Sequence, residues 1–324
     1  MVFRKERNYW EIIINRVKRY SKLYRYYVEY KTSEHKKSFG NQNPNQIFYL
    51  IRPSSDRAGL MSIHNYVAWK IRYALEQGYI PVVDYKNYPN MYLEKDEIGK
   101  INSWEYYFKQ PTCWNLEDAR RSRHVIICDC HLEAGYDGME DESEIEIFNN
   151  LIKEYIQLNK EAEKYVEAVC RALLPVNSKV LGVLGRGTDY ASLHPYKHAI
   201  VPSEQQLIDK VNELMGEWGG FDYIYLATED SSIYQTFRKE YGKSLIFHNA
   251  VLYDHDTKGQ YLASIRTNRK NDKYLKGLEY LANIYLLTKC DSIITPIVGG
   301  GLGAIRINGN KYHHKYIFDL GEYS

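Results

Sequence analysis

Short apolar runs alternate with longer amphipathic segments along most of the chain. The runs at 47–51, 79–84 and 125–130 predict buried strands, and the segment 64–77, which Gly78 closes, predicts a helix between the first two. A strand, a connection, a helix and a second strand form a βαβ unit, which builds a parallel sheet. The first half of the chain therefore predicts an α/β domain.

The second half repeats the alternation of strands and helices. Strands are predicted at 180–184, 223–228, 245–247, 292–295 and 316–318, and helices at 203–217, 231–241, 273–288 and 302–307. Between the halves, the apolar positions of 142–174 predict one long amphipathic helix, which Pro175 ends. We therefore expect an α/β protein with two Rossmann-like domains facing across a cleft, one over 47–174 with the linking helix and one over 175–324.

Residues 1–46 differ from the rest and predict a basic, Tyr-rich arm. Between Arg4 and Lys37 there are eleven Lys or Arg against four Glu, interleaved with Tyr at helical spacing. Such a helix can lie on an anionic membrane surface, or it can pack its Tyr face on the parent domain. The Tyr-rich rather than Leu-rich face favours packing, and the stretch 40–46, GNQNPNQ, predicts a polar loop.

The composition is that of a globular protein without an excess of charge. The 324 residues are 44% hydrophobic and 26% charged, with a formal net charge of +2, which argues against a nucleic-acid partner. The 32 Tyr against 9 Phe suit a carbohydrate or nucleotide surface, or reflect background composition. No stretch approaches the ~20 apolar residues of a membrane span. We expect a soluble, cytoplasmic protein, with contact of residues 1–40 at the inner face of the membrane as one role for the arm.

Five scattered cysteines give no disulfide framework and favour a reducing compartment. The stretch Cys128-Asp129-Cys130-His131 invites a zinc interpretation. No second Cys or His pair follows at ligand spacing, so a coincidence at the end of a strand is favoured.

Three loops of the second domain follow predicted parallel strands, where doubly wound sheets bind their ligands. They are 185–189, 228–232 and 296–303. In the first loop, Gly185 and Gly187 let the backbone approach an anion, and Arg186 offers a bidentate fork for phosphate oxygens. The alternative is an ordinary turn in which Arg186 pairs with Asp189.

The other two loops carry acids and glycines. Glu229 and Asp230, after Thr228, could accept hydrogen bonds from a nucleobase or ribose, or they could cap and complement the helix that begins at Ser231. In the third loop, Gly299, Gly300 and Gly301 precede a helix whose free N–H groups attract phosphate, although a purely structural role is the alternative.

Four motifs in order resemble those of a known family. GVLGRGTDY resembles the His-x-Arg-Arg-Thr-Asp loop of α-1,6-fucosyltransferases and the wider group of GDP-fucose-using enzymes with the GT-B fold. YIYLATEDSSIYQTFRKEYG is similar to that group's strand ending in Ala-Thr-Asp-Asp, and LANIYLLTKCDSIITPIVGGG is similar to its third motif. GLMSIHNYVAWKIRYALEQGYIPVVD resembles its first loop and helix.

The resemblance implies that the second domain binds a GDP-sugar and the first receives a glycan acceptor. It implies that Arg186 holds the β-phosphate, that Asn283 and the loop from Val298 line the nucleotide site, and that Gly59 and His64 lie on the acceptor side. This sequence departs from the family where Leu184 replaces the motif's His, Gly187 its second Arg, Asn283 its guanine-contacting acid, and glycines its Ser-rich loop. These changes retain the phosphate chemistry and put guanine and fucose specificity in doubt.

We therefore expect an inverting glycosyltransferase that moves fucose from GDP-fucose to a glycan hydroxyl in surface polysaccharide assembly. The departing diphosphate needs charge stabilisation, which Arg186 and loop N–H groups supply. We find no Asp-x-Asp on a strand-end loop, and we therefore expect no metal and no other cofactor. Family position suggests His194 as the general base, with Asp189 and His64 as other candidates. The alternatives are a transferase for another nucleotide sugar and a catalytically silent glycan- or nucleotide-binding protein.

Overall fold

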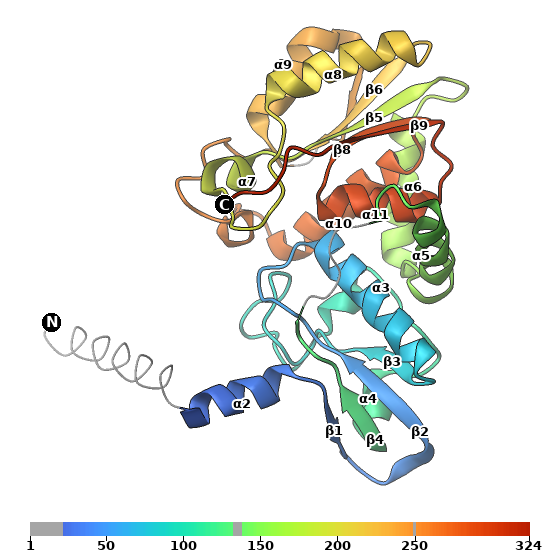
Figure 1. Cartoon of the computed structure of the whole chain (residues 1–324), viewed down its shortest axis with the longest axis vertical. Helices are drawn as coiled ribbons and strands as arrows, with labels where there is room; N and C mark the ends of the chain where they lie inside the picture. Colours follow the sequence, from blue (N-terminus) through green and yellow to red (C-terminus); the bar gives the residue numbers. More distant parts are fainter. Residues whose placement is uncertain (1–21, 132–137, 249–250) are drawn as a thin grey trace, which may run out of the picture.

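The computed structural model describes residues 22–131, 138–248 and 251–324. Two α/β parts, each built on its own sheet, follow one another along the longest axis (Figure 1). Within the described ranges, no helix is long and apolar enough to cross a membrane.

The first sheet has four strands in the order β1-β4-β2-β3. Strand β2 is parallel to both β3 and β4, whereas β1 is an antiparallel edge strand on β4. The strands are β1 (His35–Lys37), β2 (Gln42–Ile51), β3 (Ile80–Val83) and β4 (Ser122–Ile127). Helix α3 (Leu60–Glu76) makes the predicted βαβ crossover, and the short α4 (Leu116–Ala119) and a 3₁₀ turn (Ser103–Tyr106) lie in the connection to β4.

The N-terminal arm is less separate than the sequence predicts. Strand β1 belongs to the first sheet, and the expected polar loop at 40–46 is wrong because β2 already begins at Gln42. Helix α2 (Lys22–Thr32) projects from the body of the molecule (Figure 1), with Tyr26, Tyr27 and Tyr30 71%, 57% and 56% exposed. The favoured packing of the Tyr face is therefore wrong for this helix. The rest of the predicted arm, residues 1–21, lies outside the described residues.

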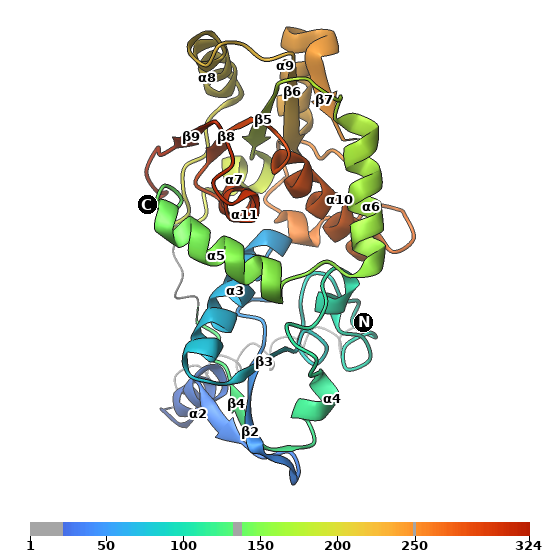
Figure 2. The same ribbon diagram turned by 90° about the vertical axis from the view of Figure 1, so that its right-hand side faces the viewer.

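The second sheet is entirely parallel, in the order β7-β6-β5-β8-β9. Its strands are β5 (Val180–Gly185), β6 (Tyr223–Thr228), β7 (Leu245–Phe247), β8 (Ser292–Pro296) and β9 (His314–Phe318). Helices α8 (Glu204–Glu217) and α9 (Ser231–Tyr241) cover the face away from the first domain, and α10 (Asp272–Leu287) and α11 (Gly299–Asn308) lie on the other (Figures 1 and 2). The strand order reverses direction at β5, which is where such sheets bind ligands.

The linking helix predicted over 142–174 is two helices, α5 (Glu142–Tyr155) and α6 (Lys160–Leu173). Asn159 caps α6 by accepting from the Ala162 N–H at 2.8 Å, and its own Nδ2 donates to the Glu105 carbonyl at 2.7 Å. The break is thus stabilised by a distant segment of the first domain. Both helices pack against the second domain's layer, α5 on α11 and α6 on α10.

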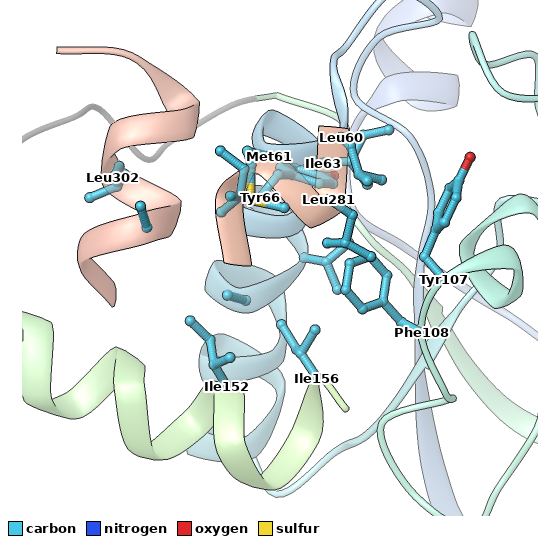
Figure 3. Packing of buried hydrophobic residues seen from close by; sticks show 14 of the residues in the cluster. Leu60, Met61, Ile63, Tyr66, Tyr107, Phe108, Ile152, Ile156, Leu281 and Leu302 are labelled. Atoms are coloured by element: carbon cyan, nitrogen blue, oxygen red, sulfur yellow. The ribbon is translucent and has the colours of Figure 1, made fainter. Parts of the chain in front are cut away.

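One hydrophobic core continues from the first domain into the second. Helices α3, α5, α10 and α11 all contribute side chains to this core, among them Met61, Ile152, Leu281 and Leu302 (Figure 3). The start of α3 meets the start of α11, where Asn65 Nδ2 donates to the Gly299 carbonyl at 3.0 Å. The contact fixes the two helix N-termini beside each other at the boundary between the domains.

Candidate functional site

The first two predicted loops lie side by side at the carboxyl edge of the second sheet. Gly185, the last residue of β5, pairs in register with Thr228, the last residue of β6. The next residue on each strand, Arg186 or Glu229, therefore points into the same space, and the two side chains form an ion pair. The sheet itself brings the cation and the acid together.

Arg186 is held on three sides. Its guanidinium pairs with Glu229 and with Asp189, whose Oδ1 is 2.7 Å away, and it lies 4.5 Å from the centre of the Tyr190 ring. Burial alone would lower the pKa of Arg186, but the two carboxylates outweigh burial and raise it. The turn-stabilising pair with Asp189 is thus present. A guanidinium has five N–H donors, so this arrangement leaves donors for a further acceptor.

Asp230 has the capping role that the sequence offered as an alternative. Its fully buried carboxylate accepts from the Ser232 and Ile233 N–H groups at the start of α9 and from the Thr188 N–H at 2.8 Å. Thr228 Oγ1 in turn accepts from the Asp230 N–H at 3.1 Å. Asp230 therefore fixes the Arg186 loop to the second loop, whereas Glu229 contacts the arginine itself.

Position 187 is Gly where the similar family motif has Arg, and there is a steric reason for this difference. A Cβ at Gly187 would lie 2.1 Å from Asp230 Oδ2, so any side chain there would displace the carboxylate. The next residue, Thr188, has φ of 50°, a strained value for a β-branched residue. Strain of this kind gathers at binding and catalytic sites, where the surrounding contacts enforce it.

The three glycines of the third loop form the first turn of α11, instead of preceding the helix as predicted. The N-cap residue Val298 makes no side-chain cap, so the first N–H groups receive no acceptor from it. A Cβ at Gly300 would lie 2.7 Å from the Tyr280 hydroxyl oxygen, and one at Gly301 would lie 2.2 Å from Thr295 Oγ1. The structural role for these glycines is therefore present, and it leaves the phosphate role as a prediction.

Asn283 lies in a buried polar network on α10. Its Oδ1 accepts from the Tyr225 hydroxyl at 2.9 Å and lies 3.0 Å from His248 Nδ1, and Tyr165 lies 3.4 Å from the other ring nitrogen. Burial lowers the pKa of His248. The predicted contact of Asn283 with a nucleotide stays a prediction, and its Oδ1 is already engaged by Tyr225 and His248.

The candidate bases differ in how accessible they are. His194 is exposed at the end of the short helix α7 (Thr188–Leu193), where its ring stacks on Tyr323 at 4.7 Å. Asp189 is mostly buried, and its Oδ2 accepts from the Leu262 N–H in the 3₁₀ turn Leu262–Ser264. Asp189 therefore fits a positioning role, and the assignment of His194 stays a prediction.

The acceptor-side role predicted for His64 does not fit its environment. His64 is fully buried against Phe108, and burial lowers its pKa to about 4. An imidazole that no acceptor hydroxyl can reach, and whose protonated form is disfavoured by burial, cannot serve as the general base. Gly59 is the N-cap of α3 and has open space around its Cβ position, so the prediction for Gly59 remains.

Two further histidines approach the site from elements that the sequence analysis did not connect to it. His198 Nδ1 lies 3.0 Å from the hydroxyl of Tyr190, the residue that covers Arg186, and burial lowers the pKa of His198. His255 Nδ1 lies 2.7 Å from Asp230 Oδ2. The loops around 197 and 255 fold back over the strand ends, and no local periodicity indicates this return.

A pocket of about 630 Å³ lies between the domains. The ion pair of Glu94, from the first domain, with Arg266, from the second, has N–O distances of 2.6 and 3.0 Å at its wall. Three aromatic residues line it, Tyr92, Tyr106 and Tyr274. Its volume lies within the usual range for small-ligand sites, and its tyrosines offer flat faces with polar tips.

No protein-family model and no curated protein sequence matches the chain. Its fold is similar to that of NodZ α-1,6-fucosyltransferase soaked with GDP-fucose, with a TM-score of 0.50 and 14% identity over 81% of this chain and 92% of that chain. Selenomethionine-labelled NodZ from Bradyrhizobium has a TM-score of 0.50 and 14% identity, and the match covers 86% of this chain and 97% of that chain. A mutant of Arabidopsis thaliana FUT1 in complex with GDP has a TM-score of 0.50 and 12% identity, and the match covers 84% of this chain and 70% of that chain. These likenesses confirm the predicted two-domain, GT-B-like α/β fold.

Proposed function

We propose that this protein is an inverting glycosyltransferase that moves fucose from GDP-fucose to a glycan hydroxyl. The observation that carries the proposal is Arg186, held by Glu229 and Asp189 at the carboxyl edge of the second sheet. The shared fold supports the choice of donor, because NodZ crystals of that fold were soaked with GDP-fucose and the FUT1 mutant is in complex with GDP.

In this proposal Arg186 stabilises the departing diphosphate. The leaving group gains negative charge as the bond to the anomeric carbon breaks, and a preorganised guanidinium in a partly buried site lowers that barrier. Glu229 and Asp189 orient the guanidinium, and its remaining N–H groups face the donor. Because this chemistry uses a fixed cation of the chain, it requires no metal ion.

Inversion requires a base on the face of the sugar opposite to the leaving group. His194 has the family position for this role, and its ring is exposed. His198 has the closer electrostatic link to the site, through Tyr190 and the charges of Asp189 and Arg186. Replacing each histidine by Gln separates them, because loss of the base lowers kcat and removes the acidic limb of its pH profile.

The acceptor binds, in this proposal, in the pocket between the domains. Tyr106 and Tyr274 are partly exposed there and offer ring faces to a sugar, while Glu97 and Asn271 offer hydrogen-bonding groups. The exposed tyrosines and the basic residues of α2 are consistent with contact of the protein with an anionic membrane that carries the glycan under assembly.

A second donor class is favoured by one specific observation. The Oδ1 of the buried Asn283 is engaged by Tyr225 and His248, and Leu184, next to Gly185 at the end of β5, offers no polar group for a guanine. A transferase for another nucleotide sugar would retain the Arg186 site and would bind a nucleobase other than guanine. A catalytically silent binding protein on the same fold would also retain it.

The test is a thermal-shift and calorimetry panel with GDP, GDP-fucose, GDP-mannose, UDP and UDP-sugars. A ligand that binds only the folded state raises Tm with its concentration. Binding of GDP and GDP-fucose with slow donor hydrolysis supports the proposal, a UDP preference changes the donor, and binding without hydrolysis indicates a silent protein. Loss of transfer in EDTA, restored by Mg²⁺ or Mn²⁺, would contradict metal independence.

A further inference from the structure

Three side chains that can ligate a metal ion meet behind the Arg186 loop. Glu204 begins α8, Asp230 precedes α9, and His255 lies in the loop after β7. One ligand atom from each lies within 4.8 Å of the others. Since they come from three separate elements and include an imidazole, they differ from the acidic residues that cluster along a single helix.

The surroundings orient these groups toward a common point. Asp230 Oδ1 is fixed by the Ser232 N–H at 2.8 Å, which leaves Oδ2 facing His255 Nδ1 at 2.7 Å. Thr236 Oγ1 donates to Glu204 Oε2 at 3.1 Å. Metal-binding carboxylates are commonly held by hydrogen bonds of this kind. The His255 side chain is 48% exposed, so an ion can enter from solvent although Asp230 is buried.

The chemistry of the three groups selects the ion. One imidazole nitrogen with two carboxylates suits Zn²⁺, whereas Mg²⁺ and Ca²⁺ prefer ligands that are all oxygen. In a tetrahedral zinc site the nitrogen and oxygen ligands lie about 3.3 Å apart, so His255 and Asp230 need to separate by about half an ångström. The Glu204 carboxylate needs to close a gap of at most about 1.5 Å, because the three ligand atoms lie within 4.8 Å of one another. The proton between His255 and Asp230 then moves to Nε2. We propose that Glu204, Asp230 and His255 bind a Zn²⁺ ion, with water completing its coordination.

The position of this zinc site gives it a structural role. Helices α8 and α9 lie on the face of the second sheet away from the first domain (Figure 1), so the ion does not face the acceptor pocket. Asp230 Oδ2 also accepts from the Thr188 N–H in the Arg186 loop. The ion therefore clamps α8, α9 and the loop after β7 behind the proposed donor site, and it takes no part in sugar transfer.

The sequence contains one Asp-x-Asp, Asp254-His255-Asp256, seven residues beyond the end of β7. This motif lies in the loop that follows β7, so the statement that no strand-end loop carries an Asp-x-Asp is wrong. The histidine between the two aspartates, and neither aspartate, makes the contact with Asp230. A search for paired acids would therefore have selected the wrong ligands at this site.

The experiment is calorimetric titration of ZnCl₂ into the chelator-stripped full chain, with MgCl₂ as the control ion and no nucleotide present. We expect one Zn²⁺ per chain, at least tenfold weaker binding in His255→Ala and in Glu204→Gln, and unchanged binding in His198→Gln and Glu213→Gln. Glu213 is a matched control because it lies on the same helix and pairs with Lys210. Co²⁺ replaces Zn²⁺ in a parallel titration, and its visible absorption should be lost in His255→Ala.

Absence of Zn²⁺ binding to the wild type, or equal binding to His255→Ala and wild type, would overturn the proposal and leave an ordinary His–Asp pair. Equal Tm values of the stripped variants and the stripped wild type check that the fold is intact, and His255→Asn serves as a second variant if alanine lowers Tm. Because no donor is present, the outcome is independent of the fucosyltransferase proposal. If both proposals hold, removing Zn²⁺ lowers Tm while sugar transfer continues.

Discussion

The carboxyl edges of the two parallel sheets are built from the same residue types and are used differently. In the first domain, Arg52 follows β2 and is 5% exposed, and its guanidinium donates to the carbonyls of Cys128 and Ser33. In the second, Arg186 follows β5, has a side chain that is 21% exposed, and pairs with side-chain carboxylates. Both guanidiniums have N–H groups beyond those used by these partners, so the difference lies in their exposure. Arg52 is enclosed in the fold, whereas Arg186 is accessible to an anion.

The acids at the two edges show the same contrast. Asp84, after β3, is fully buried and accepts from its own loop and from Arg120 at 2.7 Å. Glu229, after β6, has a partly exposed carboxylate directed at Arg186. The charged groups of the first edge are therefore bound by neighbouring parts of the same domain. Those of the second edge remain partly exposed, and the helix α11 that follows β8 at this edge has no side-chain cap. Charge at a strand end indicates a binding site only where a ligand can still reach the charged group.

The largest expected effect distinguishes the pair Arg186–Asp189 of the second domain from the pair Arg120–Asp84 of the first. Arg186→Ala should lower kcat/KM for fucosyl transfer by about 10³-fold, roughly 4 kcal/mol, because it removes the cation that meets the leaving diphosphate. Initial rates at fixed GDP-fucose, with calorimetry of GDP, measure this loss.

The matched control is Arg120→Ala in the first domain. It removes a partner of the buried Asp84, so it should destabilise the fold by about 2–3 kcal/mol in urea unfolding. The affinity of the folded protein for GDP should remain unchanged. Normal transfer by Arg186→Ala, or loss of GDP binding in folded Arg120→Ala, would reverse the assignment of the two edges.

The sequence predicts most of the fold because most of the strands have a dense apolar run of their own. The edge strand β1, His35–Lys37, has no apolar residue and was not predicted. The strand at 223–228 and the helix at 231–241 have the predicted bounds, since turn signals flank them. The break between α5 and α6 was not predicted because the apolar spacing continues across it, and its cause is the contact of Asn159 with Glu105. The spacing of apolar residues within a segment carries no information about a contact with a segment more than fifty residues away.

The site was predictable to a smaller extent. Arg186, Glu229 and Asp230 follow adjacent parallel strands, so the topology alone places them together. His198 and His255 reach the site through irregular loops, which carry no periodicity. His64 was selected from a motif, and the helix that carries it turns its ring into the core.

A second prediction concerns His64, at the contact between the domains. Burial lowers its pKa in the fold to about 4, against about 6.5 in an unfolded chain. Between these values the unfolded state binds more protons, so stability is fully present above about pH 6.5 and is lost as the pH falls toward 4, by about 3 kcal/mol. Urea midpoints from pH 7 to 4.5 measure the loss.

The variant His64→Leu should reduce this loss of stability at acid pH, because it removes the group that must stay neutral. His131→Gln is the matched control, since that side chain is 67% exposed. Identical pH dependence of wild type and His64→Leu would show that other groups govern the acid transition.

A third, smaller effect compares two glycines, Gly187 of the second domain and Gly59 of the first. Gly187→Ala should weaken GDP binding by about tenfold, roughly 1.4 kcal/mol, because its Cβ would displace Asp230 and the loop that Asp230 holds. Gly59→Ala should change GDP binding by less than twofold, since no atom lies within 4 Å of its Cβ position. Calorimetry of both variants decides this, and equal affinities would show that the Asp230 contact does not position the donor loop.

The smallest expected effect asks whether Glu229 only orients Arg186. The guanidinium is flanked by two carboxylates, so the local charge opposes a diphosphate even while the geometry favours it. Glu229→Gln keeps a hydrogen-bond acceptor and removes one negative charge, and it should tighten GDP binding about threefold, roughly 0.6 kcal/mol. Glu117→Gln, on the surface of the first domain, is the control and should change nothing. Weaker binding by Glu229→Gln would mean that the carboxylate itself contacts the nucleotide, as an acceptor for ribose or base hydrogens, and that the second edge uses its acid as directly as its arginine.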